Sequence, residues 1–507
     1  MTEEVIFEEQ KDDGLPESGF RGHPRGLMTL FFSEMWERFC YYGMRALLVL
    51  YLVESIVDGD KAAFLIYGAY TGLVYVAPVL GGKIADQLIG YKRAVILGGI
   101  LMAIGEFMIL GGGKMWLFAG MGAIIVGNGY FKANISTIVG KLYKDGDERR
   151  DSGFTIFYIG INIGALLATT VCAEVGKVYG YEYGFALAGV GMILGTLIFY
   201  TGRKTYERGA QGPDDEKLHS KWIGPLTRWH VTILGSLATI PIIYFLITYN
   251  HLVLYLLIAA GAYVVASLII GASKEGAVAR DRIIAMIILI FFNIAFWACF
   301  EQAGSSLTLF AERNVNRVIF GWEMGAATTQ FFNPAYIMIF GSIFSIMWIK
   351  LSKIGKNPNI PVKFGLGIIQ LGLGYLVVYI ASGMVGEDYQ VPLWTLAILY
   401  LLHTAGELFL SPIGLSMVTK LAPKHMTGTA MGGWFWSFAM SNYLAAIIAS
   451  ATGQGGEGEA GEVALTAQES LFQYTDVYTT MGLITVGVGL VLLILNKPIK
   501  KLMHGVE

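Results

Sequence analysis

The stretch SEMWERFCYYGMRALLVLYL, residues 33–52, places charged and hydroxyl-bearing side chains inside an otherwise apolar run that is long enough to cross a membrane. Each charge at the centre of a membrane helix costs ~2.5 to 3.5 kcal/mol, whereas each Leu, Ile, Phe or Val returns only ~0.3 to 0.6 kcal/mol. The spacing predicts that the polar side chains share one helix face that borders a wet cavity; a structural network of ion pairs is the alternative. At 100° per residue the following side chains project within roughly 140° of one another: Glu34, Glu37, Arg38, Tyr41, Tyr42 and Arg45.

Further polar side chains interrupt other apolar segments in both halves of the chain. Ionisable residues inside a membrane bundle mark candidate sites and are usually paired. The cations Arg38, Arg45 and Lys132 lie in the first half, whereas Glu301 and Glu407 lie in the second. This arrangement predicts a cavity between the halves that suits a zwitterion. Amides and tyrosines would supply orienting hydrogen bonds. These residues are Tyr75, Lys132, Tyr158 and Asn162 in the first half, and Glu301, Asn333 and Glu407 in the second.

Two other ionisable residues lie in apolar segments without an assigned role. His403 precedes Glu407 by one helical turn, and we interpret it as a packing histidine. Glu106 has no partner that can be assigned from sequence, so its role stays open.

The composition indicates a polytopic membrane protein, because 55% of the 507 residues are hydrophobic, only 15% are charged and the mean hydropathy is +0.57. The net charge of −2 gives no indication of a nucleic-acid partner. No phosphate-binding GxxxxGK[ST] motif is present, which argues against an ATP-driven pump. Glycine spacings such as GVGMILG, residues 189–195, lie in apolar segments and predict close helix packing.

Apolar runs of about 20 residues predict an all-α fold of fourteen transmembrane helices in an order of six, two and six. The first six lie near 27–57, 62–88, 94–112, 115–141, 152–176 and 183–201; the pair lies near 228–248 and 251–271; the last six lie near 280–311, 324–351, 362–384, 391–420, 427–452 and 473–496.

Lysine and arginine are concentrated in one set of connectors, which places that set and both termini in the cytoplasm. The predicted organisation is an N-terminal tail at 1–26, a six-helix bundle at 27–201, connectors with an inserted hairpin at 202–279, a second six-helix bundle at 280–496 and a C-terminal tail at 497–507. We expect a multi-pass protein of the plasma membrane, which in bacteria is the inner membrane.

Several sequence blocks carry a family resemblance that covers nearly the whole chain. Residues 34–43 resemble the ExxERFxYYG signature of the proton-coupled oligopeptide transporter family, within the major facilitator superfamily. Further similar blocks are GGKIADQLIGYKR at 81–93, GNGYFKANISTIVGKLY at 127–143, RRDSGFTIFYIGINIGA at 149–165, FWACFEQAGSS at 296–306 and AGELFLSPIGLS at 405–416. The inserted hairpin and the short loop near 385–390 resemble prokaryotic members.

The resemblance implies a major facilitator fold and two ion pairs that act as gates, Arg45 with Glu301 and Lys132 with Glu407. It implies that the amino terminus of a peptide meets Glu407, Asn162 and Asn333. Its carboxylate end would face Arg45, Lys132 and nearby tyrosines, so that the expected substrate-binding set is Arg38, Tyr41, Tyr42, Arg45, Tyr75, Lys132, Asn162, Glu301, Asn333, Glu407 and Trp434.

Proton coupling is expected to rest on Glu34, Glu37, Arg38 and Glu301. Some family members carry a histidine seven residues before the tyrosine that matches Tyr75, and this chain has Gly68 there. The carboxylates must then carry the proton.

The expected function is a proton-driven importer of di- and tripeptides that works by alternating access in a lipid bilayer. A proton gradient would supply the energy, and no cofactor or metal is expected. One alternative is a family relative that moves nitrate or another small anion. A second alternative, an intramembrane enzyme, lacks support because the sequence has neither HExxH nor a compact group of His, Cys and Asp.

Overall fold

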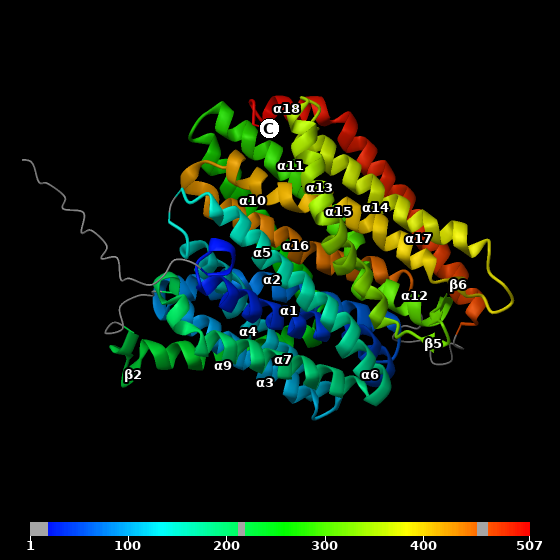
Figure 1. Cartoon of the computed structure of the whole chain (residues 1–507), viewed down its shortest axis with the longest axis horizontal. Helices are drawn as coiled ribbons and strands as arrows, with labels where there is room; N and C mark the ends of the chain where they lie inside the picture. The colour runs from blue at the N-terminus through cyan, green and yellow to red at the C-terminus, as the bar shows by residue number, and fades with distance from the viewer. Residues whose placement is uncertain (1–18, 145, 211–217, 454–464, 507) are drawn as a thin grey trace, which may run out of the picture.

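The computed structural model describes residues 19–144, 146–210, 218–453 and 465–506, and the described chain is almost entirely helical (Figure 1). Eleven of its helical segments are long and apolar enough to cross a membrane. This confirms the prediction of an all-α polytopic membrane protein. The prediction of fourteen crossings stays a prediction, as do the domain boundaries; most of the predicted tail at 1–26 lies outside the described residues.

The described first half of the chain contains six long helical segments. Two of them end in a single π-helical turn, and a π-helical turn interrupts a third. They are α1 (Gly26–Tyr51) with η2 (Leu52–Ile56), α2 (Asp60–Ile84) with η3 (Ala85–Ile89), α3 (Tyr91–Ile109), α4 (Gly113–Lys141), α5 (Arg149–Leu167) with η4 (Ala168–Cys172) and α6 (Ala173–Tyr179), and α7 (Tyr181–Thr201). A short 3-10 turn, η1 (Phe20–Gly22), precedes them.

Glycines allow these helices to approach closely. A Cβ atom added at Gly98 of α3 would lie 2.5 Å from the carbonyl oxygen of Gly127 in α4. Added at Gly195 of α7, it would lie 2.9 Å from Trp36 Cβ in α1. These contacts confirm that the glycine-rich stretch 189–195 serves helix packing.

The segment between the halves contains an inserted helical hairpin that contacts both. Its elements are η5 (Arg203–Thr205), η6 (Glu207–Ala210), the antiparallel strands β1 (Lys221–Ile223) and β2 (Leu226–Thr227), and the helices α9 (Arg228–Thr248) and α10 (His251–Ser273). Helix α9 packs against α2 and α4, whereas α10 packs mainly against α11 (Ala277–Phe300) and α16 (Thr427–Ser450). The two arms of the hairpin are therefore attached mainly to different halves.

The second half repeats the helical pattern with short strands at one end. After α11 follow η7 (Glu301–Gly304), α12 (Ser306–Asn314), β3 (Val315–Asn316), β4 (Val318–Ile319), β5 (Trp322–Glu323), η8 (Ala327–Phe331), α13 (Phe332–Lys353), α14 (Ile360–Ser382), β6 (Val391–Pro392), α15 (Trp394–Leu421), η9 (Lys424–Met426), α16, α17 (Ala467–Ile494) and α18 (Asn496–Leu502). Strand β3 pairs with β6 in parallel, and β4 pairs with β5 antiparallel.

The predicted span near 280–311 corresponds to the segment Ala277–Asn314, in which the 3-10 turn η7 separates α11 from α12 at Glu301–Gly304. At this point the backbone of Gly304 comes so close to the Tyr67 hydroxyl of α2 that a Cβ atom there would collide with it. The interruption places Glu301 at the junction between the two halves.

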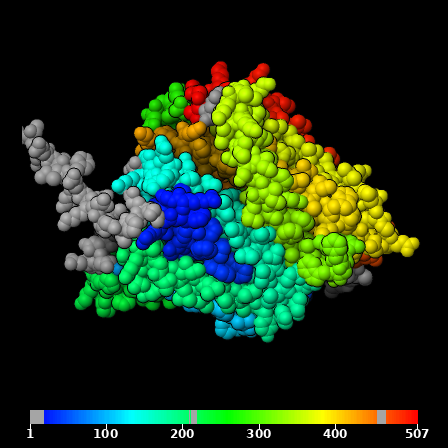
Figure 2. All heavy atoms as spheres, viewed as in Figure 1, coloured from blue at the N-terminus to red at the C-terminus, as the bar shows by residue number. Residues whose placement is uncertain are grey.

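The two halves of the chain lie on different sides of the molecule, with blue to teal residues mainly in the lower part and yellow-green to red residues mainly in the upper part of Figure 2. Their polar contacts cluster at the end where α6, α12, β5 and β6 meet (Figure 1). There Arg313 of α12 donates to both carboxylate oxygens of Asp60 in α2, at 2.6 and 2.8 Å. The Glu174 carboxylate of α6 accepts hydrogen bonds from Gly325 N at 2.8 Å and Thr328 Oγ1 at 2.5 Å.

Both described chain ends lie at the opposite end of the molecule. Arg149 donates a 2.8 Å hydrogen bond to the carbonyl oxygen of Gly22, and His504 lies 3.0 Å from the carboxylate of Asp281 at the start of α11. Arg149 also donates hydrogen bonds to Asp147, and these lower the pKa of the Asp147 carboxyl to about 2. The Asp147 carboxylate therefore stays charged at physiological pH.

Candidate functional site

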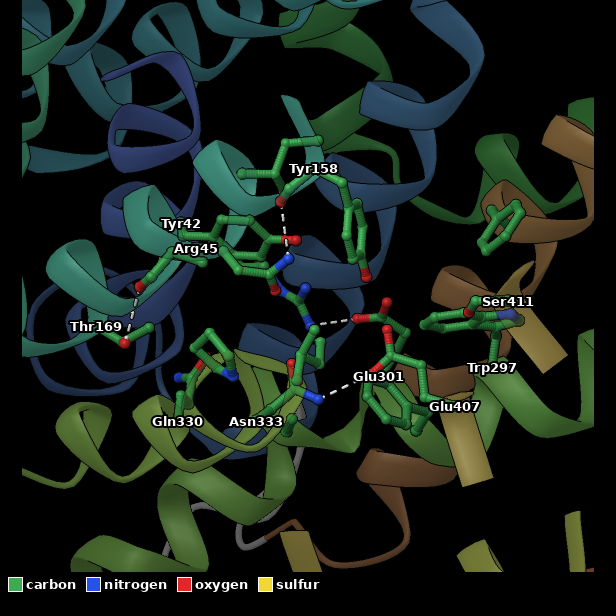
Figure 3. Close-up of a pocket in the computed structure, with 18 of the residues that line it drawn as sticks. Tyr42, Arg45, Tyr158, Thr169, Trp297, Glu301, Gln330, Asn333, Glu407 and Ser411 are labelled. Atoms are coloured by element: carbon green, nitrogen blue, oxygen red, sulfur yellow. Dashed lines mark hydrogen bonds and ion pairs between the residues drawn. The ribbon is translucent and has the colours of Figure 1, made fainter. Parts of the chain in front are cut away.

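A cavity of about 320 Å³ lies between the two halves (Figure 3). This volume is at the lower end of the range for small-molecule sites. Helices α1, α2 and α5 supply its first-half wall, and α11, η7, α13, α15 and α16 supply most of the other. The predicted residues that line it are Tyr42, Arg45, Tyr75, Tyr158, Asn162, Glu301, Asn333, Glu407 and Trp434.

Arg45 and Glu301 form a buried ion pair that joins the halves across this cavity. The Arg45 guanidinium also donates a 2.9 Å hydrogen bond to the Tyr67 hydroxyl of α2, and it lies over the Tyr42 ring at 5.9 Å. Both charged side chains are less than a tenth exposed. The Arg45 guanidinium thus has three partners, Glu301, Tyr67 and Tyr42.

Glu407 lies close to this pair but has a neutral partner. Asn333 of α13 donates to Glu407 Oε2 at 2.9 Å (Figure 3). It also lies 3.0 Å from the Thr404 hydroxyl, to which it donates. Within the described part of the chain no Lys, Arg or His nitrogen forms a salt bridge with Glu407. The carboxylate is held in place while keeping its capacity to bind a cation.

Aromatic rings cover much of the remaining wall. Tyr75 of α2 stacks on Phe438 of α16 at 5.6 Å, and Phe438 contacts both Trp297 and Trp434. Trp434 is 1% exposed, and its indole ring lies against Gly414, where a Cβ atom would collide with it. The wall between the charged groups is therefore apolar and rigid.

Glu34, Glu37 and Arg38 form a second cluster that lies behind the cavity wall. Arg38 makes two hydrogen bonds to Glu37, one of them 2.6 Å from Nη2 to Oε1, and its Nε lies 3.2 Å from Glu34 Oε1. Asn128 of α4 donates a 3.0 Å hydrogen bond to Glu37. Of the six polar side chains of this helix that were predicted to face a cavity, Tyr42 and Arg45 line it in this structure and the other four do not.

The reason is that α1 packs against α2, α4, α5 and α7 as well as against the second half. A polar stripe of roughly 140° is wider than the part of the helix that the cavity reaches. Tyr42 and Arg45 reach the cavity, while Arg38 lies over the Tyr41 ring at 5.1 Å outside it. Arg38 and Tyr41 therefore do not line the cavity in this structure.

The expected ion pair between Lys132 and Glu407 is not formed. Lys132 Nζ lies over the ring of Tyr75 at 4.6 Å; Tyr75 lines the cavity, and Lys132 does not. Glu407 accepts a hydrogen bond from Asn333 instead. The physical reason is that the halves are joined at the end opposite the chain termini, so that α4 and α15 are not drawn together. A pair that gates one side forms only when that side closes.

The two residues without an assigned role are buried. The Cys40 thiol donates a hydrogen bond to Glu106 Oε1, with 3.4 Å between sulfur and oxygen. The other carboxylate oxygen, Oε2, has no hydrogen-bond partner among the described residues. His403 packs against Tyr375, with ring centroids 4.6 Å apart, and in the described part of the chain neither ring nitrogen has a hydrogen-bond partner. This surrounding agrees with a packing role for His403.

Gly68, where the resemblance allows a histidine, lies against α16. A Cβ atom there would collide with Ala446 and would lie 3.2 Å from the carbonyl oxygen of Asn442. A larger side chain would push the helices apart.

Sequence reasoning missed several residues at the site. Asn128 was detectable as an amide inside an apolar helix, in the block 127–143. The role of Tyr67 could not be predicted from the sequence pattern. Its hydroxyl accepts a hydrogen bond from Arg45 and lies beside the backbone of Gly304 in η7, and this arrangement depends on the packing of distant segments. Trp297, Phe300, Gln330, Ser411 and Phe438 also line the cavity.

The helices and the cavity define a multi-pass membrane protein with a small chamber between two helical halves, lined by aromatic side chains and a few charged groups. A sequence model described as the POT family matches residues 92–463. An uncharacterised transporter of Bacillus subtilis is 36% identical, over 97% of this chain and 97% of the relative. A di-/tripeptide transporter of Lactococcus lactis subsp. cremoris is 34% identical, over 97% of this chain and 99% of the relative.

A crystal structure of a peptide transporter POT in complex with sulfate aligns with a TM-score of 0.83 and 35% sequence identity, over 97% of this chain and 98% of that one. The chain belongs to the POT family of proton-coupled oligopeptide transporters.

Proposed function

We propose that this protein is a symporter that imports di- and tripeptides together with protons by alternating access. The observation that carries the proposal is the state of Glu407, a buried carboxylate fixed by Asn333 at the cavity wall, with which no cation of the described residues forms a salt bridge. The names of the relatives, among them the di-/tripeptide transporter of Lactococcus lactis, support the same substrate class.

The charge arrangement fits a short peptide with free termini. A peptide ammonium would complete the pairing of Glu407, since charge-assisted hydrogen bonds are the strong ones. The peptide carboxylate would be oriented toward Arg45 and Lys132, which come from the other half. The aromatic wall gives apolar contact without polar selection, so many side chains would be tolerated.

We propose that this structure corresponds to an inward-facing state. The contacts of Asp60 with Arg313, of Glu174 with Thr328 and of Arg45 with Glu301 join the halves on the side away from the chain termini. Substrate release would take place on the side of the termini. Transport requires that these contacts break in the other state.

Proton coupling would use the carboxylates. Protonation of Glu301 would weaken its pairing with Arg45, and so loosen the join between the halves. Protonation of Glu37 or Glu34 would change the net charge around Arg38, which stays charged at all relevant pH values. A proton gradient would thereby drive the cycle without a cofactor.

The proposed location is the plasma membrane, with both termini in the cytoplasm. The lysine- and arginine-rich connectors support this orientation. The contacts of Gly22 and His504, which bring both chain ends to the same end of the molecule, agree with it.

The experiment that tests the proposal uses purified protein in liposomes, an imposed proton gradient and labelled dialanine. Uptake should be competed by di- and tripeptides and not by nitrate. Competition by nitrate alone would favour the small-anion alternative. Recovery of intact dialanine inside the vesicles would argue against an intramembrane enzyme, whereas recovery of free alanine would favour it.

A further inference from the structure

An apolar groove of about 470 Å³ lies away from the cavity, between α2, α4 and the inserted helix α9. Its lining is almost entirely apolar and includes Leu80, Ile84, Ile243 and Leu246. Leu80 is 63% exposed although it belongs to a segment that can span a membrane. The groove therefore opens toward the bilayer.

Protein side chains leave this groove unfilled because of glycine. Gly81 of α2 and Gly129 of α4 bring their two helices together at its floor. Gly235 of α9 lines the groove, and a Cβ atom added there would meet no heavy atom within 4 Å. An apolar groove within the membrane is not a stable place for water, whereas a lipid chain fits its chemistry.

A cationic and aromatic group lies at one end of the groove, at the start of α9. Trp222 of β1 lines the groove and is 50% exposed, and the Arg228 guanidinium lies over its ring at 5.8 Å. Arg228 Nε is buried without a hydrogen-bond partner among the described residues. Lys221 is exposed in the same strand as Trp222. Tryptophan and basic residues together are typical of the headgroup level of a membrane.

Two acidic residues of the described chain, one in η3 and one in η6, have partners of their own. Asp86 of η3 hydrogen-bonds Tyr91, and Glu207 forms an ion pair with Lys92 at 3.3 Å. Arg228 and Lys221 supply two positive charges beside Trp222 at this end of the groove.

We propose that this groove binds one anionic phospholipid from the leaflet on the side of the chain termini. An acyl chain would occupy the groove past Gly235, and the phosphate would pair with Arg228 and Lys221. The lipid would fill the space between the first half and the α9 arm of the hairpin.

The test uses the full-length protein and native mass spectrometry, with phosphatidylglycerol and phosphatidylcholine as the probes. Gly235→Leu adds a side chain at a groove-lining position where a Cβ atom meets no heavy atom within 4 Å. Gly487→Leu is the matched control, because a Cβ atom at Gly487 of α17 also meets nothing within 4 Å and does not line the groove. We expect retained phosphatidylglycerol to fall at least tenfold in Gly235→Leu and to stay unchanged in Gly487→Leu.

The headgroup is tested with Arg228→Gln and Lys221→Gln, against Arg280→Gln in the first turn of α11 as the control. We expect the first two to lose the preference for phosphatidylglycerol over phosphatidylcholine, with the control unchanged. Unaltered phosphatidylglycerol retention in Gly235→Leu, or an equal loss in both leucine variants, would overturn the groove assignment. Equal retention of both lipids by the parent protein would overturn the anionic headgroup. Unchanged melting temperatures in all variants show that these outcomes do not come from misfolding.

Discussion

Arg45 of α1 and Glu301 of η7 form a buried ion pair whose partners come from opposite halves of the chain. The Arg45 guanidinium also donates a 2.9 Å hydrogen bond to the Tyr67 hydroxyl, and both Arg45 and Glu301 line the cavity. The position of one proton on Glu301 can therefore influence both the join between the halves and the site where substrate binds.

Neutralising one member of this pair is expected to abolish concentrative uptake. Removing one partner of a buried pair leaves an unpaired charge that costs ~3 to 5 kcal/mol, enough to reverse a conformational equilibrium. Glu301→Gln and Arg45→Gln should shift the halves apart at the Asp60–Arg313 end. Distances between spin labels on that end would report the shift.

The exchanged variant Arg45→Glu/Glu301→Arg is the control for this prediction. Partial recovery of the parental distance distribution would show that the pair itself sets the equilibrium. Identical distributions in the parent and in both single variants would contradict a gating role.

Glu407 is expected to read the amino terminus of the substrate. Glu407→Gln should weaken binding of a dipeptide with a free amino terminus by about 10- to 150-fold, because a hydrogen bond to a charged group is worth ~1.5 to 3 kcal/mol. Asn333→Ala should have a smaller effect of the same sign. Calorimetric titration with dialanine measures both.

N-acetyl-dialanine is the matched ligand for this test, since it lacks the ammonium group. Its affinity for the parent should already be low, and Glu407→Gln should not lower it further. If free and acetylated peptides bind the parent equally, Glu407 does not have this role.

The cluster behind the cavity wall is expected to couple protons and not to bind peptide. Glu37 accepts from Arg38 and Asn128, and none of the three lines the cavity. Glu37→Gln and Glu34→Gln should abolish proton-driven uptake while preserving gradient-free exchange of peptide. Driven uptake and counterflow on the same folded protein would measure both quantities. Undiminished driven uptake in both variants would refute the coupling role.

The sequence allowed the helices to be predicted well, because long apolar runs and glycine spacing depend on local chemistry alone. The interruption at Glu301–Gly304 was not predictable in this way, since it depends on how closely Tyr67 of another helix approaches the backbone. Short strands such as β4 and β5 were also missed, because two-residue strands carry no periodic signal.

The candidate site was predictable where a charge in an apolar helix has to be compensated, as for Arg45, Glu301 and Glu407. The sequence could not show which of the six polar side chains of α1 reach the cavity. Arg38 and Arg45 are chemically alike and two turns apart, but Arg38 is surrounded by Glu34, Glu37 and Tyr41, whereas Arg45 meets a residue from the other half. The state-dependent pairing of Lys132 was likewise inaccessible from sequence.

The ion pair between Asp60 and Arg313 is expected to help hold the halves together on the side away from the termini. Asp60→Asn should raise the population of the state that is open on this side, by less than Glu301→Gln does, because Arg313 is a quarter exposed and solvent weakens its pairing. Thiol labelling of a cysteine introduced at Thr328 would measure the opening. Equal labelling in parent and variant would show that this pair is dispensable.

Proton-driven accumulation of labelled dialanine in liposomes tests the central claim most directly. With an inward proton gradient, the parent protein should concentrate dialanine above its external level. Unlabelled trialanine or a protonophore should abolish this accumulation, and nitrate should not. Accumulation that persists after the proton gradient is collapsed, or the absence of dialanine uptake by folded protein, would contradict the account.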